Sequence, residues 1–125
     1  MSERRISVLV VEDEILISNL VTEALYDEGF DVHAVPDGEE ALRYLQADPN
    51  VDVLFTDINL AGRMDGNVLA ERARLHRPDL PIVYCSGRCS PSSLSPPVPR
   101  SIFVPKPYDL NEICTLLTRL TSTTH

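Results

Sequence analysis

Apolar and polar positions follow two patterns along the chain, one typical of strands and one typical of helices. Five short apolar runs, several of them rich in β-branched residues, predict strands at residues 6–11, 30–35, 51–56, 82–85 and 101–104. Apolar residues at helical spacing predict helices at residues 14–28, 38–47 and 66–76, and a last one after Asp109. This alternation predicts the α/β class, with a doubly wound five-stranded parallel sheet, right-handed crossovers and helices on both faces.

Several side chains indicate where the helices begin. Asp37, Asp65 and Asp109 each stand directly before a helical segment, where an aspartate can accept a hydrogen bond from a free backbone amide. Glu40 and Glu112 occupy the third helical position after Asp37 and Asp109, as in a capping box. The run at residues 30–35 is less apolar than the others, so we expect it nearer the edge of the sheet.

Two helices carry apolar stripes that we expect to face the core. The helix at residues 14–28 has one row made of Leu16, Leu20 and Ala24, with a second row, Ile17, Val21 and Leu25, beside it. The last helix carries Ile113, Leu116, Leu117 and Leu120. Core packing is the first interpretation of Ile113 and Leu117, and a docking face is the alternative.

The segment between the fourth and fifth strands differs from the rest of the chain. Residues 86–100 contain four prolines and five serines, a composition through which a regular helix cannot run. We therefore expect the helix that would connect these two strands, the fourth of the domain, to be short, mobile or missing.

Length and charge set limits on function. The 125 residues suit a single domain over 1–125, with a core at about 5–121 and a frayed tail at 122–125. The formal net charge of −8 argues against nucleic-acid binding by phosphate neutralisation and against a polybasic membrane anchor. No apolar stretch has the length of a membrane span or a signal sequence, so we expect a cytoplasmic protein. Cys85, Cys89 and Cys114 match neither a disulfide framework nor a zinc site.

The charges are unevenly placed along the chain. Residues 1–57 hold 14 acidic and three basic side chains, whereas residues 58–125 hold five acidic and eight basic ones. Ten of the eleven basic residues are arginines, and the single lysine is Lys106. A compact ammonium group is a suitable partner for a phosphoryl group, which makes this lysine a candidate site residue.

The candidate chemistry falls at the carboxyl ends of the predicted strands. Glu12 and Asp13 follow the first strand, Asp57 the third, Ser86 the fourth and Lys106 the fifth. A parallel sheet brings these ends to one edge, where open α/β sheets bind their ligands. Three neighbouring carboxylates repel one another, and a hard divalent cation such as Mg²⁺ relieves that repulsion. A carboxylate, Mg²⁺, a lysine and a hydroxyl group are the parts needed to accept a phosphoryl group on aspartate.

These segments resemble the receiver domain of response regulators in two-component signalling, the CheY-like superfamily. The resemblance covers about residues 5–121 and rests on five motifs in order: VLVVEDE, LFTDINL, the M-D-G at 64–66, YCSGR and VPKPYDL. It implies a flavodoxin-like sheet in the strand order 2-1-3-4-5. It also implies a phosphoprotein of phosphorelay signal transduction that takes a phosphoryl group from a sensor histidine kinase or a phosphotransfer protein. Such a domain is not an enzyme beyond catalysing its own phosphorylation and dephosphorylation.

The resemblance assigns a role to each motif residue. Asp57 matches the phosphoacceptor. Asp13, Asp57 and the main-chain carbonyl of Asn59 match the Mg²⁺ ligands, with Glu12 acting through water. Lys106 and Ser86 would bind the phosphoryl group and drive the conformational switch. Phe103 stands in the place of the switch aromatic, but it lacks the hydroxyl group. Asn59 and Arg88 would flank the site and tune the lifetime of the acyl phosphate. Pro107 matches the family's cis-proline junction.

The chain departs from the family pattern in three places. The loop after Asp57 has Ala61 where a proline is commoner, and one extra residue before Met64. The Pro/Ser-rich segment stands where the family has its fourth helix, which puts the usual fourth-helix partner surface in doubt. No output domain follows, which suggests a stand-alone receiver that binds an unknown downstream protein or relays phosphate.

Two other classes of protein are alternatives. A pseudo-receiver would bind a partner without phosphorylation, but it would be expected to lack an acidic residue, the acceptor or the lysine, all of which are present here. An aspartyl phosphatase of the haloacid-dehalogenase type also uses Asp, Mg²⁺ and Lys. Its nucleophile follows the first strand in a D-x-D pattern, whereas here the first strand ends in Glu12 and Asp13.

Overall fold

A computed structural model describes residues 5–48, 50–58, 64–86, 99–106 and 108–121. The five strands of the described chain are β1 (Ser7–Val11), β2 (Asp31–Val35), β3 (Val53–Asp57), β4 (Ile82–Ser86) and β5 (Ser101–Pro105). The helices are α1 (Ile15–Asp27), α2 (Gly38–Ala47), α3 (Gly66–His76) and α4 (Leu110–Thr121). All neighbouring strands are parallel, in the order β2-β1-β3-β4-β5, which confirms the predicted fold class.

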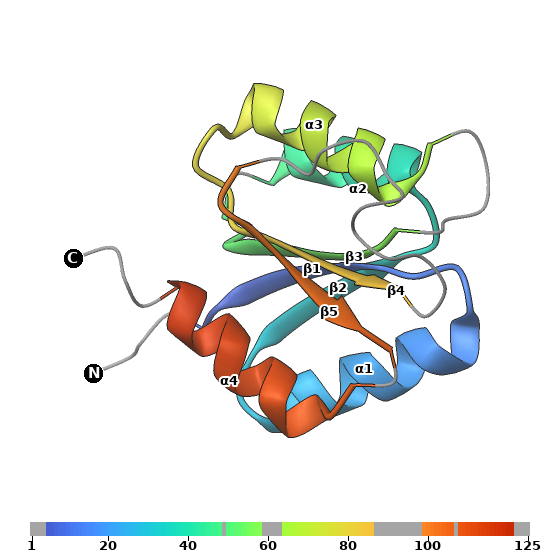
Figure 1. Cartoon of the computed structure of the whole chain (residues 1–125), viewed down its shortest axis with the longest axis vertical. Coiled ribbons are helices and arrows are strands. Elements are labelled where there is room, and N and C mark those ends of the chain that lie inside the picture. Colours follow the sequence, from blue (N-terminus) through green and yellow to red (C-terminus); the bar gives the residue numbers. More distant parts are fainter. Residues whose placement is uncertain (1–4, 49, 59–63, 87–98, 107, 122–125) are drawn as a thin grey trace.

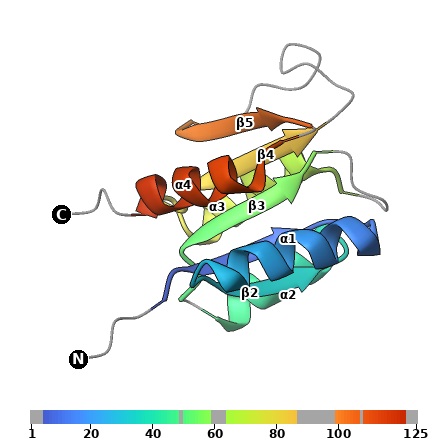
Figure 2. The same cartoon turned by 90° about the horizontal axis from the view of Figure 1, so that it is seen from below.

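The sheet is the middle of three layers. Helices α2 and α3 cover one face, and α1 and α4 cover the other, as seen edge-on to the layers in Figure 1. Figure 2 looks through α1 and α4 onto the sheet and shows the strand order. Because β1 and β3 lie inside the sheet with helices on both faces, nearly all of their residues are buried, and most of these are apolar. Each face has its own core cluster, one with Leu9, Leu54 and Ile82, the other with Val10, Phe55 and Val83.

The predicted edge position and helix starts are confirmed. Strand β2 forms one edge of the sheet, and most of its residues are not buried. The Asp37 side chain accepts a hydrogen bond from the amide of Glu40 at 2.9 Å, and α2 begins at the next residue. Asp65 does the same for the amide of Val68 at 2.9 Å, so α3 begins at Gly66.

The expected core face of α1 was only half right. Val21 and Leu25 are buried against the sheet and α4, whereas Leu16 and Leu20 are exposed to 75% and 61%. Periodicity alone could not choose between two adjacent apolar rows, and the packing of α1 on β1 and α4 selects the row with Val21. On α4, Ile113 and Leu117 are buried, as the core interpretation predicts.

Some expectations fall outside the described residues. The predicted short, mobile or missing fourth helix lies almost wholly in residues 87–98, between β4 and β5, and the helix labelled α4 is the C-terminal one. Over the described part of the chain, every helix is too short or too polar to cross a membrane.

Candidate functional site

Three carboxylates meet at the carboxyl edge of the sheet, as the strand ends predict. Glu12 and Asp13 follow β1, Asp57 is the last residue of β3, and β1 and β3 are neighbours in the sheet. One carboxylate oxygen from each of Glu12, Asp13 and Asp57 lies within 4.8 Å of the other two. Glu12 and Asp57 are buried and Asp13 is exposed, so the cluster opens to solvent on the Asp13 side.

Lys106 joins the two buried carboxylates. It follows β5, at the same edge of the sheet, and its Nζ lies 3.0 Å from Asp57 Oδ2 and 3.4 Å from Glu12 Oε1. Its side chain is 21% exposed, so the ammonium group is largely shielded from water. The lysine therefore places a positive charge directly beside the Asp57 carboxylate.

The electrostatics of Lys106 and Glu12 are those of a crowded, partly dry site. Burial alone would lower the pKa of Lys106, but the hydrogen bond to Asp57 and the charges of Asp57 and Glu12 outweigh it, so the pKa is raised. Burial raises the pKa of Glu12, and the Asp57 charge adds to this. The amide of Glu14, which donates to Glu12 Oε2 at 3.1 Å, and the charge of Lys106 offset the rise in part. Lys106 therefore stays positively charged, whereas a buried negative charge on Glu12 costs folding free energy.

The backbone of Asp57 is held on two sides. The amide of Gly66, at the start of α3, donates to the carbonyl of Ile58 at 2.8 Å. A Cβ at position 66 would lie 2.3 Å from the carbonyl oxygen of Asp57, so only glycine allows this approach. On the other side, the amide of Ile58 donates to the carbonyl of Cys85 on β4 at 3.0 Å. The M-D-G motif thus fixes the peptide that follows the acidic side chain.

An apolar layer lies beneath the charged groups on the α4 side of the sheet. Tyr108 packs edge-on to Phe55, with ring centroids 5.9 Å apart. Burial raises the pKa of Cys85 to about 12, with the nearby Asp57 charge adding to the effect. This thiol stays protonated at neutral pH and is not a candidate nucleophile.

The remaining predicted site residues are placed in part. Ser86 closes β4 opposite Pro105 of β5, which puts its backbone at the correct edge, but its side chain is outside the described part. Phe103 lies on β5 opposite Tyr84 and packs, partly buried, against the core on the α2/α3 face. Asn59, Arg88 and Pro107 lie outside the described residues, so their proposed roles stay predictions.

The donor set suits a divalent cation. Hard oxygen ligands from one or two carboxylates, together with water and phosphate oxygen, are what Mg²⁺ binds in proteins. The exposed Asp13 and the buried Asp57 provide such oxygens close together, and Glu12 adds a third nearby. Three carboxylates against one ammonium leave an excess of negative charge that a bound cation would balance.

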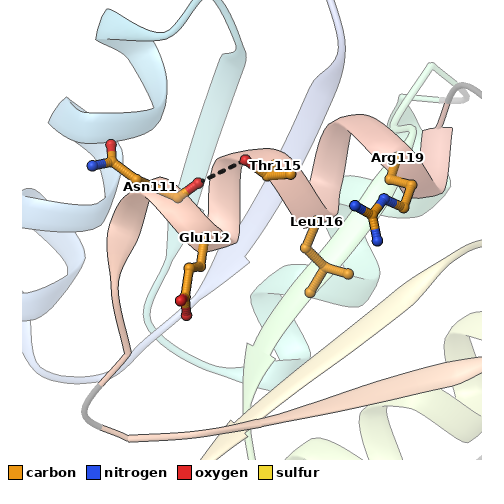
Figure 3. Close-up of a pocket in the computed structure, with 5 residues that line it drawn as sticks. All are labelled: Asn111, Glu112, Thr115, Leu116 and Arg119. Atoms are coloured by element: carbon orange, nitrogen blue, oxygen red, sulfur yellow. Dashed lines mark hydrogen bonds between the residues drawn. The ribbon is translucent and has the colours of Figure 1, made fainter.

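A hollow elsewhere on the described surface lacks this chemistry. It runs along α4 and is lined by Asn111, Glu112, Thr115, Leu116 and Arg119, as Figure 3 shows. The hydroxyl of Thr115 donates to the carbonyl of Asn111 at 3.1 Å, which satisfies it within the helix. The hollow is therefore a shallow feature of the helix surface, separate from the carboxylate edge.

Comparison with known proteins decides the family. The model of the response regulator receiver domain matches residues 8–118. This chain belongs to the receiver domain family. It is 32% identical over 120 residues to the nitrogen assimilation regulatory protein NtrX of Azorhizobium caulinodans, covering 93% of this chain and 26% of that protein. It is 30% identical over 112 residues to the sensor kinase CckA of Brucella abortus, covering 87% of this chain and 12% of the kinase. The receiver therefore spans about a quarter or less of these two relatives.

Solved receiver structures agree with the fold. A response regulator receiver protein from Sinorhizobium medicae superposes with a TM-score of 0.90 at 31% identity, covering 99% of this receiver and all of that chain. The receiver domain of NtrX from Brucella abortus superposes with a TM-score of 0.81 at 30% identity, covering 94% and 99% of the two chains. The strand order inferred from the family motifs is thus seen in the receiver's own structure and in its relatives.

Sequence reasoning missed one buried polar contact near the site. The hydroxyl of Tyr84 on β4 donates to Asn67 Oδ1 on α3 at 3.0 Å. Tyr84 is only 2% exposed and Asn67 6%, and the sequence motifs did not single out Asn67. A signal was present, since a polar residue directly follows the M-D-G motif where α3 enters the core.

Proposed function

We propose that this receiver accepts a phosphoryl group on Asp57 from a phosphohistidine, in a Mg²⁺-dependent reaction. The observation that carries the proposal is the contact of Lys106 Nζ with Asp57 Oδ2 at 3.0 Å, beside the cluster of three carboxylates. Burying a carboxylate next to an ammonium group and two further carboxylates costs free energy, which a fold would not be expected to keep without a use for the cluster. A role of the cluster in phosphoryl transfer explains why each of its charged residues is present.

The transfer step balances as a simple displacement. A carboxylate oxygen of Asp57 attacks the phosphorus, the P–N bond of phosphohistidine breaks, and its electron pair returns to the imidazole nitrogen, which takes up a proton. Mg²⁺ bound by Asp13, Asp57 and the Asn59 carbonyl, with Glu12 through water, would offset charge on the phosphoryl oxygens. Lys106 offsets charge from the opposite side. Later attack by water on the phosphorus breaks the acyl P–O bond and restores the Asp57 carboxylate.

The switch follows from the new charge on Asp57. The phosphoryl group would gain hydrogen bonds from Lys106 and Ser86. A hydrogen bond to a charged group contributes about 1.5–3 kcal/mol. Two such bonds approach the roughly 5.5 kcal/mol needed to reverse a 1:99 equilibrium. Phosphorylation would thus favour a second conformation, read by a downstream protein or used to pass the phosphoryl group on.

The surface beside the acceptor suits a helical phosphodonor. Ile15, Leu16 and Leu20, at the start of α1 just after the acidic pair, are between 61% and 75% exposed. A protein that delivers phosphohistidine to Asp57 must cover this part of the chain, and its own apolar helix face would bury these side chains. We propose this patch, Ile15, Leu16 and Leu20, as the docking face for a histidine kinase or phosphotransfer protein. A cytoplasmic location remains the expectation for such a partnership.

Phosphorylation with a small donor tests the proposal. The receiver is incubated with Mg²⁺ and acetyl phosphate, and the modified residue is identified by mass spectrometry. Wild type and Asp109→Asn, a change at the exposed start of α4, should gain one phosphoryl group, whereas Asp57→Asn should gain none. Equal labelling of Asp57→Asn would overturn the acceptor assignment. A wild type that binds neither Mg²⁺ nor phosphate would indicate a phosphorylation-independent pseudo-receiver instead.

A further inference from the structure

A hydrogen bond buried in the core joins β4 to α3. The Tyr84 hydroxyl and Asn67 Oδ1 are 3.0 Å apart, and the two residues are 2% and 6% exposed. Around them the α2/α3 face of the sheet is packed with apolar side chains, including Leu69, Ile82 and Met64. Loss of a hydrogen-bond partner by a buried polar group costs about 1–3 kcal/mol, so replacing either residue also affects the other.

Each end of this bond is attached to a segment that borders Asp57. Tyr84 lies opposite Thr56 of β3 and two residues before the end of β4, where Ser86 stands. Asn67 is the second residue of α3 and follows Gly66, which packs on the carbonyl oxygen of Asp57. The bond therefore ties together the β4 end and the α3 start, which lie on either side of the acceptor backbone.

Phe103 is the residue of β5 that pairs with Tyr84, and it has no hydroxyl group. In this part of the sheet the aromatic hydroxyl is on β4, where it bonds to α3. This bond is therefore the contact through which the aromatic hydroxyl of this part of the sheet sets the position of the β4 end relative to α3.

We propose that Tyr84 and Asn67 are positioning residues for the phosphoryl group on Asp57. Their hydrogen bond fixes the β4 end relative to the α3 start, so that the phosphoryl site is formed before the group arrives. Groups held in place beforehand bind a ligand without the cost of ordering them. This inference rests on the proposed function, because it concerns the same phosphoryl group.

A purely structural bond would behave differently. Removing it would lower the melting temperature but leave the affinity of the folded protein for a phosphoryl mimic unchanged. Positioning predicts a loss of affinity for the mimic, while Mg²⁺ alone binds as before, because neither residue is part of the carboxylate cluster.

The experiment uses beryllofluoride, which mimics a phosphoryl group on aspartate. Its affinity is measured by ¹⁹F NMR in saturating Mg²⁺, at a temperature where every variant is fully folded. The variants are Tyr84→Phe, Asn67→Leu and the double substitution, and Mg²⁺ affinity alone is measured for each. The matched control is Tyr44→Phe, which removes a hydroxyl that donates to Asp48 Oδ2 at 3.0 Å between α2 and its C-cap.

We expect each single variant to lose about tenfold in beryllofluoride affinity. The double variant should lose less than the product of the two single losses, because the two side chains share this bond. Tyr44→Phe should bind like wild type. If Tyr84→Phe does not fold, Asn67→Leu decides the question alone, since it keeps the core filled.

The outcomes separate this inference from the proposed function. Unchanged affinity in the folded single variants, alongside normal binding by wild type, would overturn the positioning role and leave the acceptor assignment intact. Failure of wild type to bind beryllofluoride, or equal binding by Asp57→Asn, would overturn both.

Discussion

Lys106 Nζ lies 3.0 Å from Asp57 Oδ2, although 49 residues separate the two in the chain. The parallel order of the sheet makes this contact, because it brings the residue after β5 to the edge where β3 ends. The ammonium group is the counterion of a carboxylate that is 8% exposed, and this relationship leads to the first prediction.

Lys106→Met should destabilise the fold when divalent cations are absent. It leaves Asp57 and Glu12 buried without their shared ammonium group, so the free energy of unfolding should fall by about 2–3 kcal/mol. Arg43→Met is the matched control, since Arg43 pairs with Glu40 on the exposed side of α2 and should cost less than about 1 kcal/mol. Urea unfolding in EDTA measures both. Mg²⁺ should recover part of the loss, and equal losses in the two variants would contradict the prediction.

Glu12→Gln should stabilise the metal-free protein at neutral pH. The pKa of Glu12 is raised in the folded state, so the folded chain holds that proton more tightly than the unfolded chain does. Stability from this group is then present below the unfolded pKa, near 4.5, and is lost as pH rises through the folded pKa. Unfolding curves in EDTA between pH 4 and pH 8 should show that the free energy of unfolding of the variant rises relative to that of wild type as pH rises. Glu14→Gln, two residues along and exposed, is the control. If the difference in the free energy of unfolding between variant and wild type is constant across this range, the pKa shift of Glu12 is not the cause of that difference.

Gly66→Ala should weaken the site as well as the fold. The added Cβ would meet the Asp57 carbonyl oxygen at 2.3 Å and Ile58 Cα at 2.8 Å, which are backbone atoms that cannot move aside cheaply. We expect a loss of about 2 kcal/mol in stability, together with weaker Mg²⁺ binding measured by calorimetry. Gly29→Ala is the control, because its φ of 98° strains alanine while nothing lies within 4 Å. It should cost about 1 kcal/mol and leave Mg²⁺ binding unchanged. Unchanged Mg²⁺ affinity in Gly66→Ala would show that α3 does not hold Asp57 in place.

Leu16→Glu and Leu20→Glu should separate two routes of phosphorylation. Both side chains are already exposed, so the fold and the reaction with acetyl phosphate should be preserved. Transfer from an autophosphorylated histidine kinase that phosphorylates wild type should slow by about tenfold or more, because charge would enter an apolar contact. Leu75→Glu is the matched control, being 82% exposed near the end of α3, away from the acceptor edge. Loss of labelled phosphate from the kinase over time gives the rates. Slowing by Leu75→Glu to the same degree would refute docking on α1.

Much of the fold could be predicted because local and distant signals agree. The apolar runs of β1 and β3 allow only a sheet buried on both faces, and Asp37 and Asp65 cap helices where their spacing indicates. The choice between the rows of Leu20 and Val21 on α1 could not be made from periodicity. That choice depends on what packs against the helix, and in particular on α4, which the chain reaches about ninety residues later.

The same contrast holds for the site. Asp57 and Lys106 could be placed at one edge because the ends of parallel strands must meet there. The hydrogen bond between Tyr84 and Asn67 could not be predicted, because it joins a strand to a helix, and the position of the helix along the strand depends on side-chain packing. Nor could the sequence indicate that Lys106 contacts Glu12 as well as Asp57, since this requires the reach of the lysine across β3 and β4.

The contact between Lys106 and Glu12 joins residues 94 positions apart, one after the first strand of the sheet and one after the last. On the ribosome, all three carboxylates are therefore made well before the lysine that balances them. A nascent chain folded only as far as β4 would hold these like charges together at one edge without their ammonium group. Their repulsion would oppose closure of that edge until β5 arrives or a divalent cation binds. The last strand thus completes the charge balance of the domain as well as its sheet.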